Sequence, residues 1–315
     1  MRHILAAAAA AATLALPHAA LADVTVYSAG PAGLIRALAK DFTQETGIKV
    51  NVFQATTGKV MARVQAEASN PVADVMISAS WGTADNYAKR GWLLPLKSKA
   101  AAKVPDFLKN DTAVAEGVAA LAIAWNPKSK TPKPQDWSDL AKPEYKNLVT
   151  MPDPAQSGSA YELVAALQKK FGWTLFEKLK ANGLVVAGAN AAALNPVLQG
   201  AKAAVFGAVD YISLHDKAKG ESVDVIFPKS GTVVSPRPIM IFKWSKHQHD
   251  ANAFVDYVLS EAGQKAVAKV KLMPARTDVK ADRPLISDLT VLQSSTDQAE
   301  RKKILAHFAS IFGTK

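Results

Sequence analysis

The sequence contains no cysteine among its 315 residues, and this absence removes several functions at once. Disulfide bonds, thiolate metal sites and thiol nucleophiles all require a cysteine sulfur. Stability must therefore come from burial of the hydrophobic residues, which make up 49% of the chain. A chain of this length exceeds one ordinary domain and holds enough apolar residues for two moderate cores.

Two motifs of catalysis and nucleotide binding are also missing. Gly-x-Ser-x-Gly does not occur, and Thr57-Gly58-Lys59 lacks the upstream glycine of a phosphate-binding P-loop. None of the histidines follows a predicted strand as the base of a catalytic triad would. His247 and His249 have no carboxylate cluster nearby, so they form an incomplete metal site. We therefore expect no enzyme, of phosphoester chemistry or any other, and neither a cofactor nor a metal.

Long apolar stretches are missing except near the N-terminus. Residues 4–16, after Arg2, are apolar but fewer than the roughly 20 residues that a membrane-spanning helix needs. Ala20-Leu21-Ala22 has the small-x-small pattern that signal peptidase cleaves, so residues 1–22 are predicted to be a signal peptide removed before Asp23. The lack of cysteine near this cut argues against a lipid anchor. We expect a monomeric, periplasmic protein.

Acidic residues are in the minority, since 27 Asp and Glu stand against 38 Lys and Arg, and the formal net charge is +11. A basic surface attracts anions, including nucleic acids, membrane headgroups and small oxyanions. The Lys and Arg residues are spread along the chain, neither gathered in a block nor alternated with aromatic residues, so nucleic acid is the poorest of these partners. A solvated, lysine-rich surface accounts for most of the charge.

A unit of strand, loop and helix recurs along the chain. The predicted strands are residues 24–28, 48–53, 73–77, 148–151 and, more weakly, 184–187. Strands that alternate with helices indicate an α/β fold with a mostly parallel sheet in each half. Amphipathic helices are predicted over residues 250–270 and 304–312, and both are interpreted as packing elements.

Two apolar strands, residues 119–125 and 233–242, are expected to cross between two lobes. The first lobe is predicted to contain residues 23–122 and 238–280. The second is predicted to contain residues 123–237 and 281–315.

Four of the five loops that follow the repeated strands carry Ser or Thr, usually beside Gly and just before a helix. Loops after parallel strands meet along one sheet edge, which is where ligands bind. Helix N-termini present unpaired N–H groups and a partial positive charge, and hydroxyls add neutral donors, so this pattern suits a phosphate-like anion. The alternative is that each hydroxyl is an ordinary N-cap. Four such loops in a basic, secreted chain favour a binding site.

Several segments together resemble one family. They are residues 24–28, Asn70-Pro71-Val72-Ala73-Asp74-Val75, Trp137-Ser138-Asp139-Leu140 and Asp153-Pro154-Ala155-Gln156-Ser157-Gly158-Ser159-Ala160-Tyr161. Across nearly the whole mature chain, the sequence resembles periplasmic ABC-importer binding proteins of the ferric-iron, hexose-phosphate and 2-aminoethylphosphonate group. The resemblance implies a type 2 periplasmic-binding-protein fold, with two α/β lobes that are joined by two hinge strands and close on ligand. It also implies ABC permease subunits as partners.

The residues at Asp210-Tyr211 bear on the choice among the three ligands. Ferric-binding members of the family usually have two adjacent tyrosines at this place. In this chain Asp210 stands where those proteins have the first tyrosine. Hexose-phosphate members generally place an acidic residue where this chain has Lys229-Ser230-Gly231-Thr232. A phosphonate with a short amine needs a hydroxyl-lined site and one carboxylate. The expected ligand is therefore 2-aminoethylphosphonate or a close analogue, with hexose phosphate or ferric iron as alternatives.

The resemblance also implies which residues bind the ligand. The phosphonate is expected to contact Ser28, Thr56, Thr57, Ser80, Ser157, Ser159 and Tyr161, and the amine and carbon chain are expected to contact Asp210, Tyr211 and Trp81. For Tyr161 the alternative is a packing role. Asp210 is equally suited to capping a helix or pairing with a lysine, and Tyr211 and Trp81 to packing as buried aromatics.

Overall fold

The structure is a computed structural model, and it describes residues 23–293 and 298–314. The predicted signal peptide, residues 1–22, lies outside the described residues. Within residues 23–293 and 298–314, no helix combines the length and the apolar character that crossing a membrane requires.

Strands and helices alternate through most of the chain. The strands are β1 (Val24–Ser28), β2 (Val50–Gln54), β3 (Val75–Ile77), β4 (Val114–Trp125), β5 (Val149–Met151), β6 (Val185–Val186), β7 (Ala204–Val209), β8 (Asp224–Ile226), β9 (Val234–Ile241) and β10 (Met273–Pro274). The α-helices are α1 (Ala32–Thr46), α2 (Thr57–Ala66), α3 (Trp81–Lys89), α4 (Gly158–Phe171), α5 (Thr174–Ala181), α6 (Asn190–Leu198), α7 (Asp210–Ala218), α8 (Gln248–Val258), α9 (Glu261–Lys269) and α10 (Gln298–Phe312). Short 3-10 helices are η1 (Ala100–Lys103), η2 (Asp106–Leu108), η3 (Trp137–Ala141), η4 (Pro143–Tyr145) and η5 (Ile286–Asp288).

The main sheet runs in the order β2-β1-β3-β9-β4-β7-β5-β6, with β8 and β10 paired to β4. β1 pairs in parallel with β2 and β3, and β5 pairs in parallel with β6 and β7. The central strands β4 and β9 are antiparallel to each other and to their other neighbours. The prediction of a parallel sheet in each half is therefore confirmed, with an antiparallel pair between the halves.

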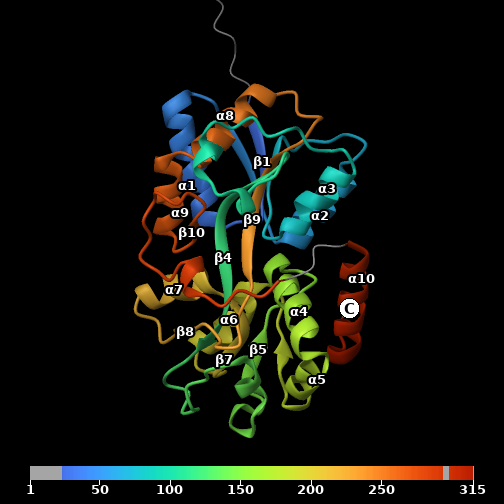
Figure 1. The fold of residues 1–315 in the computed structure, drawn as a ribbon, viewed down its shortest axis with the longest axis vertical. Helices are drawn as coiled ribbons and strands as arrows, with labels where there is room; N and C mark the ends of the chain where they lie inside the picture. The colour runs from blue at the N-terminus through green and yellow to red at the C-terminus, as the bar shows by residue number, and fades with distance from the viewer. Residues whose placement is uncertain (1–22, 294–297, 315) are drawn as a thin grey trace, which may run out of the picture.

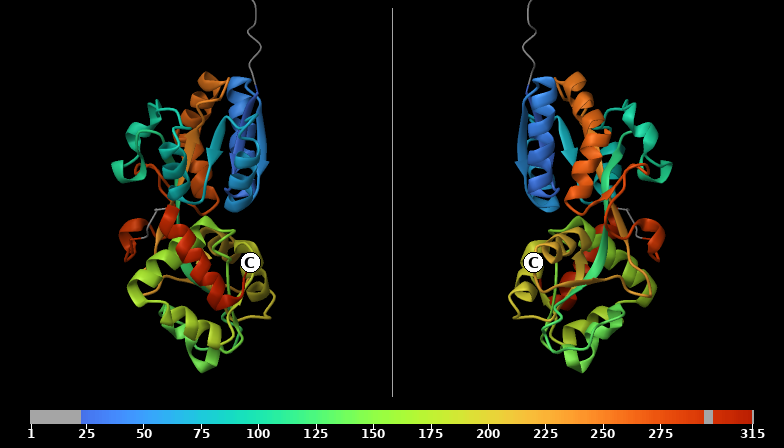
Figure 2. Two further views of the ribbon diagram at one scale, coloured as in Figure 1. Left: turned by 90° about the vertical axis from the view of Figure 1, so that its right-hand side faces the viewer. Right: turned by 90° about the vertical axis from the view of Figure 1, so that its left-hand side faces the viewer.

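Two lobes lie on either side of this antiparallel pair, and both views in Figure 2 show the narrow waist between them. β4 and β9 run side by side from one lobe into the other (Figure 1). They are the two predicted hinge strands, and the expected fold of two α/β lobes is confirmed. The residue boundaries of the lobes stay a prediction.

Helices cover both faces of each lobe. In the first lobe α1, α8 and α9 lie on one side of the sheet and α2 and α3 on the other (Figure 1). In the second lobe α4, α5 and α10 pack together on one side, and α6 and α7 lie on the other. This arrangement leaves the carboxyl ends of the parallel strands, and the helix N-termini that follow them, along the edges where the two lobes meet.

Two predicted elements differ from the structure. The single helix predicted over 250–270 is two helices, because the Ser260 hydroxyl accepts a hydrogen bond from Gly263 N and starts α9 anew. The first crossing strand begins at Val114, five residues before the predicted start at 119. The sequence pattern did not predict this part of the strand because it contains Glu116 and Gly117, and both residue types are depleted in strands.

Candidate functional site

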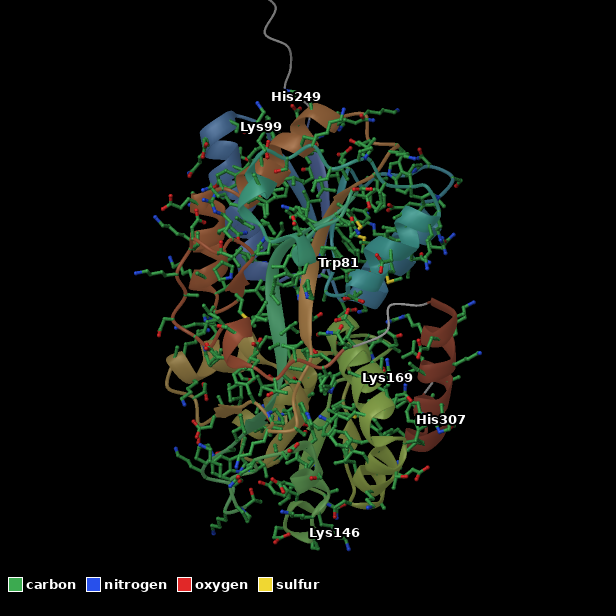
Figure 3. The ribbon with its side chains drawn as sticks, viewed as in Figure 1. Trp81, Lys99, Lys146, Lys169, His249 and His307 are labelled. Carbon is green, nitrogen blue, oxygen red and sulfur yellow. The ribbon has the colours of Figure 1, made fainter. Side chains whose placement is uncertain are left out.

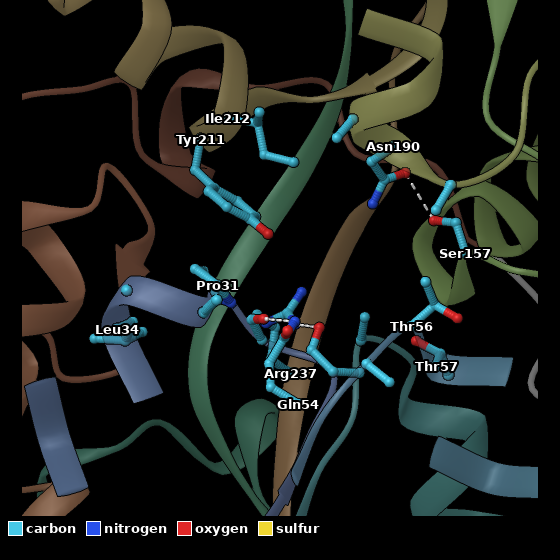
Figure 4. Close-up of a pocket in the computed structure, with 18 of the residues that line it drawn as sticks. Pro31, Leu34, Gln54, Thr56, Thr57, Ser157, Asn190, Tyr211, Ile212 and Arg237 are labelled. Carbon is cyan, nitrogen blue, oxygen red and sulfur yellow. Dashed lines mark hydrogen bonds between the residues drawn. The ribbon is translucent and has the colours of Figure 1, made fainter. Parts of the chain in front are cut away.

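A cavity of about 610 Å³ lies between the two lobes. Residues from both lobes and from the hinge strand β9 line it (Figure 4). The first lobe contributes the loops after β1 and β2, and the second contributes the starts of α4 and α6 and, from α7, Tyr211, Ile212 and His215. Its size is within the range that holds a small organic ligand.

Four helices begin at this cavity. Ala32 and Thr57, the first residues of α1 and α2, line it from the first lobe, while Ser157, the N-cap of α4, and Asn190, the first residue of α6, line it from the second. The first turn of each helix has N–H groups without intrahelical partners, and the helix dipole adds a partial positive charge there. The cavity is therefore suited to an anion.

The charged side chains at the cavity have the same sign. Arg237 and Lys59 line it together with His215, and the lining described by the structure includes no Asp or Glu. Arg237 is only 1% exposed, and its Nη2 donates a hydrogen bond to Ala29 O at 2.6 Å. A buried guanidinium at the cavity wall adds a full positive charge where the helix N-termini supply partial ones.

Hydroxyl groups add neutral donors and acceptors. Thr56 Oγ1 is buried and has no hydrogen-bond partner in the structure. The Ser157 hydroxyl accepts a hydrogen bond from Ala160 N at 3.3 Å and lies 2.9 Å from Asn190 Oδ1 (Figure 4). The phenol of Tyr211 points into the cavity on the side opposite Thr57 (Figure 4). The lining therefore offers several groups that form hydrogen bonds around one space.

Four of the ten predicted binding residues line this cavity, namely Thr56, Thr57, Ser157 and Tyr211. The other six lie near it without lining it, namely Ser28, Ser80, Trp81, Ser159, Tyr161 and Asp210. Ser28 is fully buried, and its hydroxyl accepts a hydrogen bond from Gly30 N at 2.9 Å, which fixes the loop after β1. Ser159 is also fully buried, and its hydroxyl lies 3.3 Å from that of Ser157.

Ser80 and Tyr161 line a small crevice beside the cavity together with Arg301. The Arg301 guanidinium lies 4.1 Å from the centre of the Tyr161 ring. Tyr161 thus has a cation–π contact, which agrees with the packing role considered for it, and its contact with a ligand stays a prediction.

Asp210 is fully buried at the start of α7 and forms an ion pair with Arg283. It also accepts a hydrogen bond from Tyr211 N at 2.7 Å. A contact between Asp210 and a ligand amine stays a prediction, and it would require this ion pair to open.

Trp81 lies where the lobes meet (Figure 3). Its backbone N–H, at the start of α3, donates a hydrogen bond of 3.2 Å to Glu162 Oε1 on α4 in the other lobe. Burial raises the pKa of Glu162 to about 7, and hydrogen bonds from Ser80 and Ser235 oppose that rise. Gly158 allows this close approach, because a Cβ on it would lie 2.8 Å from Ser80 Cβ.

Sequence reasoning missed six polar residues at the cavity, namely Gln54, Lys59, Gln156, Asn190, His215 and Arg237. A signal for Arg237 was present, since it is the one charged residue in the predicted crossing strand 233–242. Asn190 belongs to the weakest of the five repeated loops and carries no hydroxyl. The exposed Gln54 and Lys59 have no distinguishing pattern along the chain.

Comparisons with known proteins agree with this architecture. The family model for bacterial extracellular solute-binding proteins matches residues 24–270. The chain is 25% identical over 249 residues to a protein described as 2-aminoethylphosphonate-binding and periplasmic from Salmonella paratyphi A, covering 76% of this chain and 73% of that protein. It is 27% identical over 282 residues to the major ferric iron-binding protein of Neisseria meningitidis serogroup B, covering 84% and 83%.

A solved structure is similar in fold. It is the periplasmic binding protein AfuA of Actinobacillus pleuropneumoniae with fructose-6-phosphate bound, which superposes with a TM-score of 0.85 at 21% identity. The superposition covers 93% of this chain and 99% of that one. The predicted type 2 periplasmic-binding-protein fold is thereby confirmed.

The buried ion pair predicts a stability effect for Asp210→Asn. The change leaves the fully buried Arg283 guanidinium without its carboxylate, so we expect the free energy of unfolding to fall by about 3 kcal/mol. Urea denaturation followed by circular dichroism measures this change. The double variant Asp210→Asn/Arg283→Gln should recover part of the loss, and a double variant as unstable as the sum of the two single ones would contradict the pairing.

The close approach of the lobes predicts an effect for Gly158→Ala. The added Cβ would overlap Ser80, so we expect the lobes to separate and the radius of gyration to increase in small-angle X-ray scattering. Gly33→Ala is the control, because a Cβ there meets no atom within 4 Å. Identical scattering from the two variants would mean that the lobes are not held together at Gly158.

Proposed function

This chain belongs to the family of bacterial extracellular solute-binding proteins, and we propose that it captures a small organic phosphorus oxyanion and delivers it to an ABC permease. The observation that carries the proposal is the convergence of four helix N-termini and the buried Arg237 on one cavity without a carboxylate in its described lining. A tetrahedral oxyanion has acceptors in several directions and suits such a set of donors.

The cavity also has room for an organic group on phosphorus. Its volume of about 610 Å³ exceeds what a bare oxyanion fills, and Leu34 and Ile212 add apolar wall. Apolar and aromatic walls with a few polar groups are typical of small-molecule sites. We therefore propose a phosphonate or phosphate monoester and not inorganic phosphate as the transported solute.

Two substituents are considered. 2-Aminoethylphosphonate is the solute in the name of one relative, but in this chain the candidate partner for its ammonium group, Asp210, is paired with Arg283. A sugar phosphate has hydroxyls in place of the ammonium group, and the amides of Gln54 and Asn190 at the cavity suit hydroxyls. Hexose phosphate is therefore the second candidate ligand.

Ferric iron fits this cavity less well. Iron prefers hard anionic ligands such as phenolate, and among the described lining residues Tyr211 offers the one phenol. Burial raises the pKa of Tyr211, which disfavours its phenolate form. The Arg237 charge at the same cavity repels a cation.

Capture would proceed by closure of the lobes about β4 and β9. The cavity has donors from both lobes, so a ligand that touches both sets gains contacts only when the lobes are together, and this shifts the population towards the closed form. Delivery to the permease would follow in the periplasm, the compartment that the predicted signal peptide implies.

A thermal-shift screen identifies the ligand class. The panel is 2-aminoethylphosphonate, glucose 6-phosphate, inorganic phosphate and ferric citrate. We expect one of the two organic phosphorus compounds to raise the melting temperature most, because a ligand that binds the folded state stabilises it by mass action. Stabilisation by ferric citrate alone, or by nothing in the panel, would refute the proposed ligand.

Calorimetry on serine variants then tests the cavity itself. Ser157→Ala should weaken binding of the ligand found in the screen by about tenfold, since it removes one hydroxyl at the cavity. Ser260→Ala is the matched control, because Ser260 also caps a helix through its hydroxyl but does not line the cavity. Each variant should lose about 1 kcal/mol of stability, so an equal loss of affinity in both would place binding elsewhere.

A further inference from the structure

Glu116 is a buried acid beside the cavity that the binding role above does not use. It lies on β4, is 1% exposed, and neither of its carboxylate oxygens has a hydrogen-bond partner. Its ion-pair partner is Arg237, at 3.8 Å from Arg237 Nε to Glu116 Oε2. That separation is longer than a hydrogen bond, so the two charges attract without a direct donor–acceptor contact.

An irregularity in the hinge sheet brings the two residues together. Ala115 pairs with Pro238 and Val118 with Pro236, so Glu116 and Gly117 together lie opposite Arg237 alone. Two residues opposite one is the geometry of a β-bulge, which redirects side chains and is frequent next to functional sites. The bulge places Glu116 beside the guanidinium that lines the cavity.

Gly30 lies between Glu116 and the cavity and has no side chain to separate them. Gly30 lines the cavity, and a Cβ on it would lie 3.7 Å from Glu116 Oε2 and 3.8 Å from Arg237 Nη2. Gly30 adds no side chain at this point, and the atom nearest to its Cβ position is Ser28 Oγ at 3.0 Å. An anion held by Arg237 beside Gly30 lies close enough to Glu116 to repel its carboxylate.

Other elements bring few charges to Glu116. From α7, Tyr211 interacts with it, but burial raises the pKa of the Tyr211 phenol and keeps it neutral. From α9, Gln264 donates a hydrogen bond to the backbone O of Glu116 and not to its carboxylate. Ser28 on β1 is uncharged, and β10 contributes Met273 and Pro274. Within the described residues, Arg237 is thus the charge that favours the ionised form of the Glu116 carboxyl.

The opposing effects of burial and of Arg237 bring the pKa of Glu116 near neutral pH. Burial raises the pKa of Glu116 to about 7, and the charge of Arg237 opposes this rise. An anion on Arg237 cancels much of the guanidinium's field, which leaves a second negative charge unsolvated beside the first. Protonation of Glu116 relieves that repulsion.

We propose that Glu116 takes up a proton when a phosphorus oxyanion binds Arg237, so that the acid acts as a charge-balancing residue behind the binding site. The inference rests on the proposed function, since it assumes an anionic ligand at this cavity. The sign of the effect follows from linkage. Binding takes up protons wherever Glu116 is ionised in the free protein and protonated in the complex, so Glu116 makes affinity fall as pH rises above about 7.

The contribution of Glu116 is measured as a difference between variants, because the ligand's own second ionisation acts in the opposite direction. Glu116→Gln keeps the shape of the side chain and removes its titration. Calorimetry with 2-aminoethylphosphonate, glucose 6-phosphate and inorganic phosphate, in two buffers of different ionisation enthalpy, counts the protons taken up per ligand bound. We expect the wild type to take up as much as about one proton more than Glu116→Gln, and to lose affinity relative to it by up to about tenfold per pH unit above pH 7.

Glu162→Gln is the discriminating comparison, because burial also raises the pKa of Glu162 to about 7. This variant should take up protons as the wild type does. Loss of the uptake in Glu162→Gln and not in Glu116→Gln would assign it to the lobe contact and overturn the proposal. Normal binding with equal uptake in wild type and Glu116→Gln would overturn it while leaving the proposed function intact, whereas no binding of any of the three anions would refute both.

A second measurement does not depend on folding of Glu116→Gln. In the wild type with ¹³C-labelled glutamate carboxyls, two resonances should titrate with a midpoint near pH 7, and the one that persists in Glu162→Gln belongs to Glu116. We expect its midpoint to rise when the bound anion is added. A midpoint that stays in place at saturation would contradict the proposal.

Discussion

The pairing of β4 with β9 is the constraint on which the rest of the structure depends. Both strands belong to the sheets of both lobes, and all twelve residues of β4 are buried. Because the same strands carry both sheets, the carboxyl ends of β1 and β2 on one side and of β5 to β7 on the other face a common space. The helix N-termini reach the cavity through this arrangement, and this is why the cavity suits an anion.

The buried charged residues lie where the loss of hydration costs free energy. Arg237 and Glu116 lie in the hinge sheet without a direct hydrogen bond between them, and Asp210 pairs with Arg283 beside α7. Buried ion pairs often contribute little to stability compared with apolar residues of the same size. Their cost is understandable if Arg237 is kept for an anion and if the Asp210 pair fixes the start of α7, which places Tyr211 at the cavity.

Much of the fold could be predicted because each strand, loop and helix unit has a local pattern of its own. The site was predictable in part for the same reason. Thr56, Thr57 and Ser157 line the cavity, whereas Ser80 and Ser159 have the same local pattern and do not line it. A hydroxyl at a helix start does not reveal which side of the helix meets the other lobe. Arg237 and Glu116 depend on the register between distant strands, which no local pattern contains.

The prolines on either side of Arg237 bear on the order in which the hinge and the two lobes would contact a ligand. Pro236 and Pro238 have fixed φ angles and no N–H group, so the backbone that carries the guanidinium is stiff although it lies at the pivot. When two bodies rotate about an axis, points on the axis move least and points at the rim sweep the widest arc. In the proposed closure Arg237 would therefore move least, and the helix N-termini of the two lobes would move furthest towards the ligand.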